Sequence, residues 1–143
     1  MALPPEPIST DTDQGKAEER VNAFQRSGGP FVAAVEATRM PMLVTDPTVD
    51  GNPIVYVNQS FIELFGYTRE EVLGRNYFFL AGPNTDPAVE RHIRAAMKAN
   101  EPLNLEVSLR AKDGRVVWAA QFVSPVRDAK GQVIQHFASF LHR

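Results

Sequence analysis

Apolar and polar residues alternate without interruption over residues 103–110, and this is the clearest pattern in the chain. A period of two places successive side chains on opposite faces of a β-strand, so the segment predicts a strand with one buried face. Its apolar positions are Leu103, Leu105, Val107 and Leu109. Residues 112–114, Lys-Asp-Gly, follow as a hairpin turn.

Two more strands are predicted over residues 115–126 and 132–141, and both carry apolar residues on both faces. A strand with this pattern is covered on both faces. The face that points away from the helices is expected to present Val116, Trp118, Phe122, Val133, Phe137 and Leu141. An apolar surface of this size rarely stays bare on a soluble monomer. We expect the cover to come from N-terminal residues, from a second subunit, or from both; the N-terminal candidates are Phe31, Val32 and Val35.

The first half of the domain is predicted to hold two short strands, 42–45 and 54–57, followed by short helices. Asn58 is placed to cap the first of these helices, because asparagine side chains accept from free backbone N–H groups. Thr68 and Glu71 have the spacing of a capping box, which predicts the start of the next helix.

The strongest helix signal begins at Asp86-Pro87, a capping residue followed by a proline, and ends near Asn100. Its apolar stripe consists of Val89, Ile93, Ala96 and Met97. His92 stands at the margin of this stripe, so we expect it on the surface. His136 falls on the inner face of the last strand and is expected to be a hydrogen-bonded core residue.

The order of elements is therefore two strands, several short helices and three strands, with no βαβ alternation. This order predicts an α+β domain: a five-stranded antiparallel sheet with short helices on one face. Residues 1–14 are rich in proline and polar residues and are expected to be a flexible arm. Residues 15–40 are expected to be an N-terminal helical cap, and residues 41–143 the compact domain.

Composition narrows the classes of function. The 143 residues include no cysteine, which excludes disulfides, cysteine-based zinc sites and thiol chemistry. A formal net charge of −2 offers no basic surplus for nucleic acid. No apolar run approaches the roughly 18–20 residues of a membrane span, and the N-terminus lacks a signal-peptide pattern. We expect a cytoplasmic protein with neither a nucleic-acid nor a membrane partner. No metal-ligand spacing or nucleophile–base set is evident, so we expect no catalytic activity within these residues.

Residues 74–87 read Gly-Arg-Asn-Tyr-Phe-Phe-Leu-Ala-Gly-Pro-Asn-Thr-Asp-Pro. This segment resembles the signature of LOV (light-oxygen-voltage) domains, the flavin-binding blue-light sensors of the PAS family, whose pattern is roughly G-R-N-C-R-F-L-Q-G-x-x-T-D. The resemblance covers about residues 41–141 and implies the PAS fold. It also implies that Tyr77 stands where the family has its photoreactive cysteine. A phenol cannot form the cysteinyl adduct with flavin.

Gly114 and Gly131 fix the register of the hairpins, so the other flavin contacts of the family can be placed on this chain. The resemblance implies that five polar contact positions have become Phe78, Ala81, Leu109, Ala119 and Phe140. Arg94 matches the second phosphate-binding arginine. Gln121 stands where the family has a phenylalanine near the flavin ring.

These replacements weigh against flavin. Each polar group of the ring that is buried without a partner costs roughly 1–3 kcal/mol, and a micromolar affinity is worth only about 8 kcal/mol. We therefore expect no flavin mononucleotide. Two alternatives remain for the interior. Bulky side chains fill it as ordinary core, or an apolar pocket remains and holds another small molecule through Gln121 or the Tyr77 hydroxyl.

The resemblance implies a sensory or protein-interaction module that acts as the input domain of a signal-transduction protein, often a sensor histidine kinase. The effector is expected beyond residue 143. PAS domains commonly dimerise through the outer face of the sheet, so a homodimer that uses this face and the N-terminal helix is expected. The alternative function is a receptor that binds a flavin or another small apolar ligand in the PAS cavity.

Overall fold

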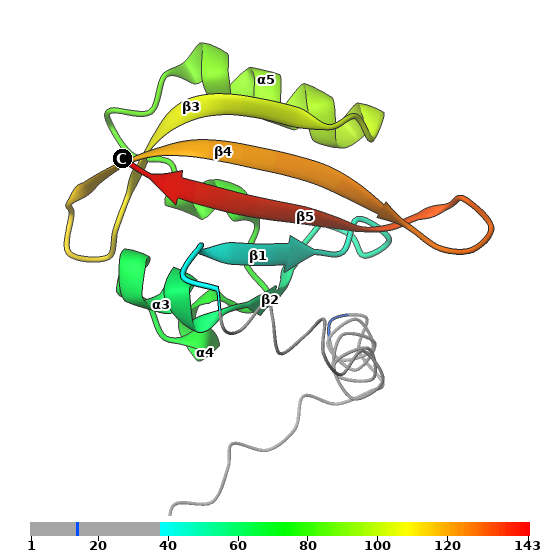
Figure 1. Ribbon diagram of the computed structural model, residues 1–143, viewed down its shortest axis with the longest axis horizontal. Helices are drawn as coiled ribbons and strands as arrows, with labels where there is room; N and C mark the ends of the chain where they lie inside the picture. The colour runs from blue at the N-terminus through cyan, green and yellow to red at the C-terminus, as the bar shows by residue number, and fades with distance from the viewer. Residues whose placement is uncertain (1–13, 15–37) are drawn as a thin grey trace, which may run out of the picture.

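The computed structural model describes Gln14 and residues 38–143 (Figure 1). The remainder of the predicted arm and most of the predicted helical cap lie outside the described residues, and so do Phe31, Val32 and Val35. Gln14 is helical, and its side-chain amide donates to the Ile54 carbonyl at 3.2 Å. Residues 38–40, at the end of the predicted cap, form bends and not a helix.

A five-stranded antiparallel sheet forms the centre of the domain, as the sequence predicted. Its strands lie in the order β2-β1-β5-β4-β3, so the first and last strands of the sheet in chain order lie side by side. The strands are β1 (Met42–Thr45), β2 (Ile54–Val57), β3 (Leu103–Arg110), β4 (Val116–Arg127) and β5 (Val133–His142). Only the bounds of β4 and β5 differ from the prediction, by one residue each.

The helices are α3 (Gln59–Phe65), α4 (Arg69–Val72), the 3₁₀ helix η1 (Tyr77–Leu80) and α5 (Pro87–Ala99). Figure 1 shows α3 and α4 beside β1 and β2, and α5 alongside β3. Local signals in the sequence set where these helices begin. Asn58 accepts from the Phe61 N–H at 3.0 Å, and the capping box of Thr68 and Glu71 is formed in both directions.

One hydrophobic core joins the helices to the inner face of the sheet. Phe61 and Phe65 of α3, Ile93 of α5 and Phe140 of β5 all belong to it, and each is almost fully buried. The clean alternation of β3 corresponds to this arrangement, because Val107 and Leu109 are buried while Glu106 and Arg110 are exposed. The α+β architecture therefore follows from two patterns in the sequence: the period of two in the strands and the apolar stripe of the helix that begins at Asp86-Pro87.

The outer face of the sheet carries large apolar side chains that reach solvent. Trp118 is 54% exposed and Leu141 is 47% exposed. Val116 and Phe122 are exposed as well, and Val133 and Phe137 are partly buried. We call these six residues the outer patch.

Candidate functional site

Tyr77 lies at the start of η1 with its side chain pointing into the core. Asn76 positions it, because its side chain caps η1 by accepting from the Phe78 N–H at 2.9 Å and its backbone bridges to Pro53. Only 2% of Tyr77 is exposed. Its hydroxyl donates a hydrogen bond to Oε1 of Gln121. Burial raises the pKa of this phenol well above its usual value, although the bond to Gln121 opposes the shift. Tyr77 is therefore a neutral donor at physiological pH.

Gln121 lies at the middle of β4, where it pairs with Leu105 on one side and with Phe140 on the other. It is 1% exposed. Its Oε1 accepts from Tyr77, but its Nε2 finds no hydrogen-bond partner in the described part of the chain. A buried amide donor without a partner costs free energy. The Gln121 Nε2 atom is therefore a buried donor beside Tyr77 that lacks a hydrogen bond.

Aromatic rings occupy the space between η1, α3 and the sheet. The Tyr77 ring stacks on the Phe140 ring with 6.3 Å between centroids and 20° between planes. Phe140 in turn meets Phe65 edge-on at 5.7 Å, and Phe65 contacts Phe61 at 4.7 Å. Tyr77, Gln121 and Phe140, three positions that the sequence assigned to the family flavin pocket, are thus in mutual contact.

Phe78 and Arg94 form a second pair that adjoins the first, because the Phe78 ring meets the Tyr77 ring edge-on with 4.9 Å between centroids. The Arg94 guanidinium lies 3.8 Å from the centroid of the Phe78 ring, a cation–π contact. Its Nη2 atom also lies 2.9 Å from a carboxylate oxygen of Glu90, one turn earlier on α5. The charge that the resemblance assigned to a phosphate is therefore engaged by a carboxylate and an aromatic ring.

Of the remaining predicted positions, Leu109 and Ala119 belong to the same core, and Ala81 lies at its margin. Leu109 and Ala119 are 3% and 1% exposed, on β3 and β4. Ala81 is partly buried at the end of η1, where its backbone N–H bonds to Phe78. An alkyl side chain can neither donate nor accept, so these positions offer no hydrogen bond to a ligand.

His136 is a buried, hydrogen-bonded residue, as predicted, while His92 is exposed on α5. The partners of His136 were not foreseen: Nε2 lies 3.0 Å from Oδ1 of Asn100, and Nδ1 lies 3.4 Å from Nδ2 of Asn52. Both asparagines have positive φ, 56° and 46°. Burial lowers the pKa of His136, so the ring stays neutral. The sequence signal that could have indicated these partners is the asparagine at each turn, because asparagine is enriched at positive φ.

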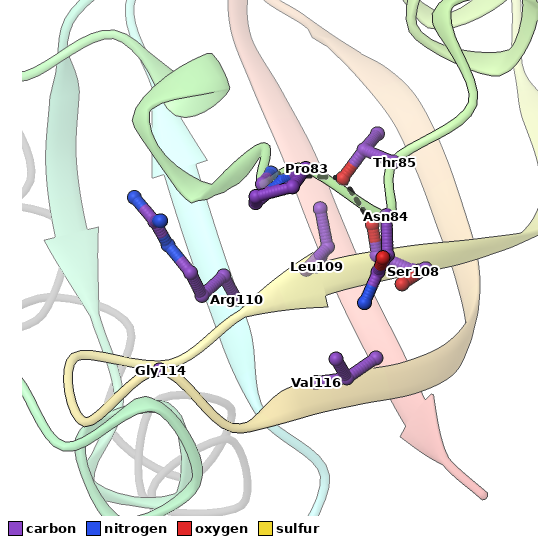
Figure 2. Close-up of a pocket in the computed structure, with 9 residues that line it drawn as sticks. Pro83, Asn84, Thr85, Ser108, Leu109, Arg110, Gly114 and Val116 are labelled. Atoms are coloured by element: carbon purple, nitrogen blue, oxygen red, sulfur yellow. Dashed lines mark hydrogen bonds between the residues drawn. The ribbon is translucent and has the colours of Figure 1, made fainter.

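A surface cavity beside β3 also escaped sequence reasoning (Figure 2). Its volume is about 210 Å³, and it lies between the loop 82–85 and the adjacent ends of β3 and β4. No spacing rule connects these segments, which are brought together by the fold. Among the described residues, no group of three or more His, Cys, Asp or Glu side chains could hold a metal ion.

With this geometry established, comparison with known proteins identifies the family. A family model of the PAS domain matches residues 39–142.

The chain belongs to the PAS domain family. Solved structures assign this PAS domain to the LOV type. A LOV domain studied with a flavin analogue superimposes with a TM-score of 0.76 at 33% identity, covering 85% of this chain and 87% of that one. The LOV domain of a blue-light-activated histidine kinase from Erythrobacter litoralis gives a TM-score of 0.68 at 26% identity, covering 72% and 94%.

Curated relatives of this PAS domain include the blue-light-activated histidine kinase of Brucella canis, 44% identical over 117 residues. The corresponding kinase of Brucella anthropi is 38% identical over 117 residues. In both cases the alignment covers 82% of this chain and 24% of the relative. The chain thus spans about a quarter of the length of these kinases. No helix among the described residues is long and apolar enough to cross a membrane.

Proposed function

We propose that this PAS domain is the sensory input domain of a histidine kinase, and that it works without cysteinyl-flavin photochemistry and without flavin. The kinase relatives support the first part, since they share a domain that makes up about a quarter of their length. The domain itself is not catalytic in this proposal. Its role is to change conformation or partner contacts and pass that change to an effector.

The contact between Tyr77 and Gln121 is the observation that carries the second part. Tyr77 stands at the position that the LOV resemblance assigns to the photoreactive cysteine, and the sequence has no cysteine elsewhere. Its ring is buried against Phe140, and its hydroxyl is bonded to Gln121 across the core. A planar ring system placed between η1 and the sheet would have to displace these side chains. Close-packed interiors resist such displacement.

The chemistry of the surrounding side chains points the same way. Leu109 and Ala119 cannot bond to the polar edge of a flavin, and Phe78 cannot replace an arginine at a phosphate. Arg94, which could, is engaged by Glu90 and Phe78. The five replacements together turn a polar flavin site into an apolar core.

The outer patch supports a second subunit as part of the proposed function. Trp118, Phe122 and Leu141 are exposed on one face of the sheet. Contiguous apolar surfaces of this kind usually mark interaction sites. We propose that two copies of the domain pack through this face, with further cover from the N-terminal segment.

A second candidate function is a receptor for a small apolar ligand in the interior. The unpartnered Nε2 of Gln121 favours it, because a ligand with one acceptor would satisfy this donor. Such a ligand would have to enter beside Tyr77 and Phe140. The Tyr77 and Phe140 rings stack on each other there, so we prefer an interior filled by side chains to one that holds a ligand.

An absorption spectrum of the purified protein, taken before and after incubation with flavin mononucleotide, tests the proposal. We expect no bound chromophore and no shift of the flavin bands. A matched variant replaces the altered positions by the residues of the family pattern: Tyr77→Cys, Phe78→Arg, Ala81→Gln, Leu109→Asn, Ala119→Asn, Gln121→Phe and Phe140→Gln. This variant is expected to gain flavin. A wild-type protein that purifies yellow, or one whose kinase activity responds to blue light at full length, contradicts the proposal.

A further inference from the structure

The solvent-facing side of α5 carries positive charge. Arg91, Arg94 and Lys98 are exposed and follow one another at intervals of three and four residues, so they lie on one face of the helix. The acidic residue of α5, Glu90, is partly buried and paired with Arg94 at 2.9 Å. Arg91 and Lys98 take part in none of the ion pairs found among the described residues. Two cations of this face are therefore open to an anionic partner.

A third cation lies across η1 from this face. Arg75 is exposed, and its guanidinium lies 5.2 Å from the centroid of the Phe79 ring. The preceding residue of η1, Phe78, contacts the Arg94 guanidinium of α5. Because Phe78 and Phe79 are consecutive, η1 lies between Arg75 and the basic face of α5. The term basic track is used below for the three cations Arg75, Arg91 and Lys98.

Gln14 holds the N-terminal part of the chain next to the basic track. Its Nε2 donates to the Ile54 carbonyl at 3.2 Å, and the same carbonyl accepts from the Gly74 N–H at 2.9 Å. The Gln14 Cδ lies 3.9 Å from the place where a Cβ on Gly74 would stand. Gly74 directly precedes Arg75 in the chain. The residues that precede Gln14 therefore start beside the first cation of the track.

Residues 1–13 are acidic, and we call them the acidic segment. They contain Glu6, Asp11 and Asp13 and no lysine or arginine. The chain has 15 basic and 17 acidic residues; 3 and 6 of these fall in residues 1–37, which leaves 12 and 11 in residues 38–143. The formal charge of −2 thus comes from the N-terminal residues, while residues 38–143 carry a formal charge of +1.

We propose that the acidic segment docks on the basic track of its own chain. Asp11 and Asp13 pair with Arg75, and Glu6 reaches Arg91 and Lys98 on α5. An extended chain spans roughly 3.3 Å per residue, so the eight residues from Glu6 to Gln14 reach about 26 Å. That length suffices to cross η1, whose four residues rise about 8 Å.

The attachment at Gln14 makes this docking effective. Exposed ion pairs are individually weak, but a short tether raises the local concentration of the segment to about the millimolar range. The outer patch is apolar, and burying carboxylates against it is unfavourable, so it does not compete for these residues. Docked in this way, the acidic segment covers η1, the element that holds Tyr77, and keeps other acidic partners away from α5.

The test is paramagnetic NMR on the 143-residue chain. Because the sequence has no cysteine, Ser9→Cys introduces a single thiol for a nitroxide spin label. We expect amides 91–98 of α5 to be broadened and those of β4 to be unaffected. Residues 74–76 broaden in any case, since Gln14 holds the segment there, so α5 is diagnostic. In about 1 M sodium chloride, where the screening length is about 3 Å, the broadening of α5 is expected to fall severalfold. Unbroadened α5 amides, or broadening that salt leaves unchanged, overturn the proposal.

Charge variants of the labelled chain separate ion pairing from proximity. Arg91→Gln combined with Lys98→Gln is expected to reduce the broadening of α5 severalfold. Arg127→Gln combined with Lys130→Gln, at exposed residues of the β4–β5 hairpin, removes the same charge elsewhere and is expected to leave the broadening unchanged. Equal reductions in the two double variants overturn the proposal.

A mixed sample distinguishes the chain's own acidic segment from that of a second copy. Isotope-enriched chain without the label is mixed with labelled chain that is not enriched. We expect no broadening of α5 in this mixture. Broadening as strong as in the enriched, labelled chain would place the segment of one copy on α5 of another and overturn the intramolecular proposal.

Discussion

The Nε2 atom of His136 lies 3.0 Å from Oδ1 of Asn100, the residue that ends α5. An amide oxygen can only accept, so this contact places the imidazole proton on Nε2 and leaves Nδ1 to accept from Asn52. One histidine of β5 thereby joins the turn before β2 to the turn after α5. The geometry requires a neutral ring, because a proton on Nδ1 would face the amide donor of Asn52.

This requirement predicts a pH-dependent stability. Burial lowers the pKa of His136 below the ordinary value of 6.5, so the unfolded chain takes up a proton at a higher pH than the folded protein does. The contribution of neutral His136 to the free energy of unfolding is therefore fully present above about pH 6.5. It decreases as the pH drops from there toward the folded pKa. Urea denaturation between pH 7.5 and 5 measures it.

His136→Gln keeps a hydrogen-bonding side chain but removes the titrating group, so we expect its stability to vary less over this range. His92→Gln, at an exposed histidine of α5, serves as the control and is expected to keep the wild-type slope. Equal slopes in the wild type and in His136→Gln would show that the histidine is not responsible.

The core hydrogen bond predicts a coupled pair of substitutions. Tyr77→Phe removes the donor and leaves both ends of the buried Gln121 amide unpaired, so we expect it to destabilise the domain by about 1–3 kcal/mol. Adding Gln121→Leu removes the unpaired amide and is expected to recover most of that loss. Chemical denaturation of the two single variants and the double variant measures the coupling. A Tyr77→Phe variant as stable as the wild type would mean that this bond contributes little.

The elements that could be predicted from the sequence are those set by residues close together in the chain. Asn58, Thr68 and Asp86 cap helices whose first turns follow directly, and Gly114 and Gly131 fix the hairpins that set the register of β3, β4 and β5. Alternation then assigned Val107, Gln121 and Phe140 to the inner face. The α+β sheet could be predicted because these signals act over a few residues.

Contacts between distant residues could not be predicted in this way. Tyr77 and Gln121 are 44 positions apart, and His136 is 84 positions from Asn52. Each pair depends on how η1 or a turn is placed over the sheet. The pattern of apolar and polar residues does not indicate that placement. The cavity beside β3 escaped prediction for the same reason, since Gly82 meets Arg110 only after folding.

The hydrogen bonds of Glu71 predict an unusually low pKa for a surface carboxyl group. A hydrogen bond from the Lys112 ammonium, at 2.7 Å, and one from the Thr68 N–H hold the pKa of the Glu71 carboxyl at about 2. We expect its carboxyl carbon to titrate near pH 2 by NMR in the wild type. Lys112→Met should raise that pKa part of the way toward its ordinary value of 4.5, because the Thr68 bond remains. Lys130→Met, at an exposed lysine in the turn before β5, is the control.

The outer patch predicts the oligomeric state. Trp118 is 54% exposed at the middle of the apolar face, so a charge at this position would have to be buried in any dimer that uses it. We expect the wild type to be a dimer by size exclusion with light scattering, and Trp118→Lys to be a monomer with an unchanged fold by circular dichroism. Glu63→Lys, at an exposed site of α3, should remain a dimer. Deletion of residues 1–38 should weaken the dimer. A wild-type monomer that is insensitive to this deletion would refute the role of the patch as an interface.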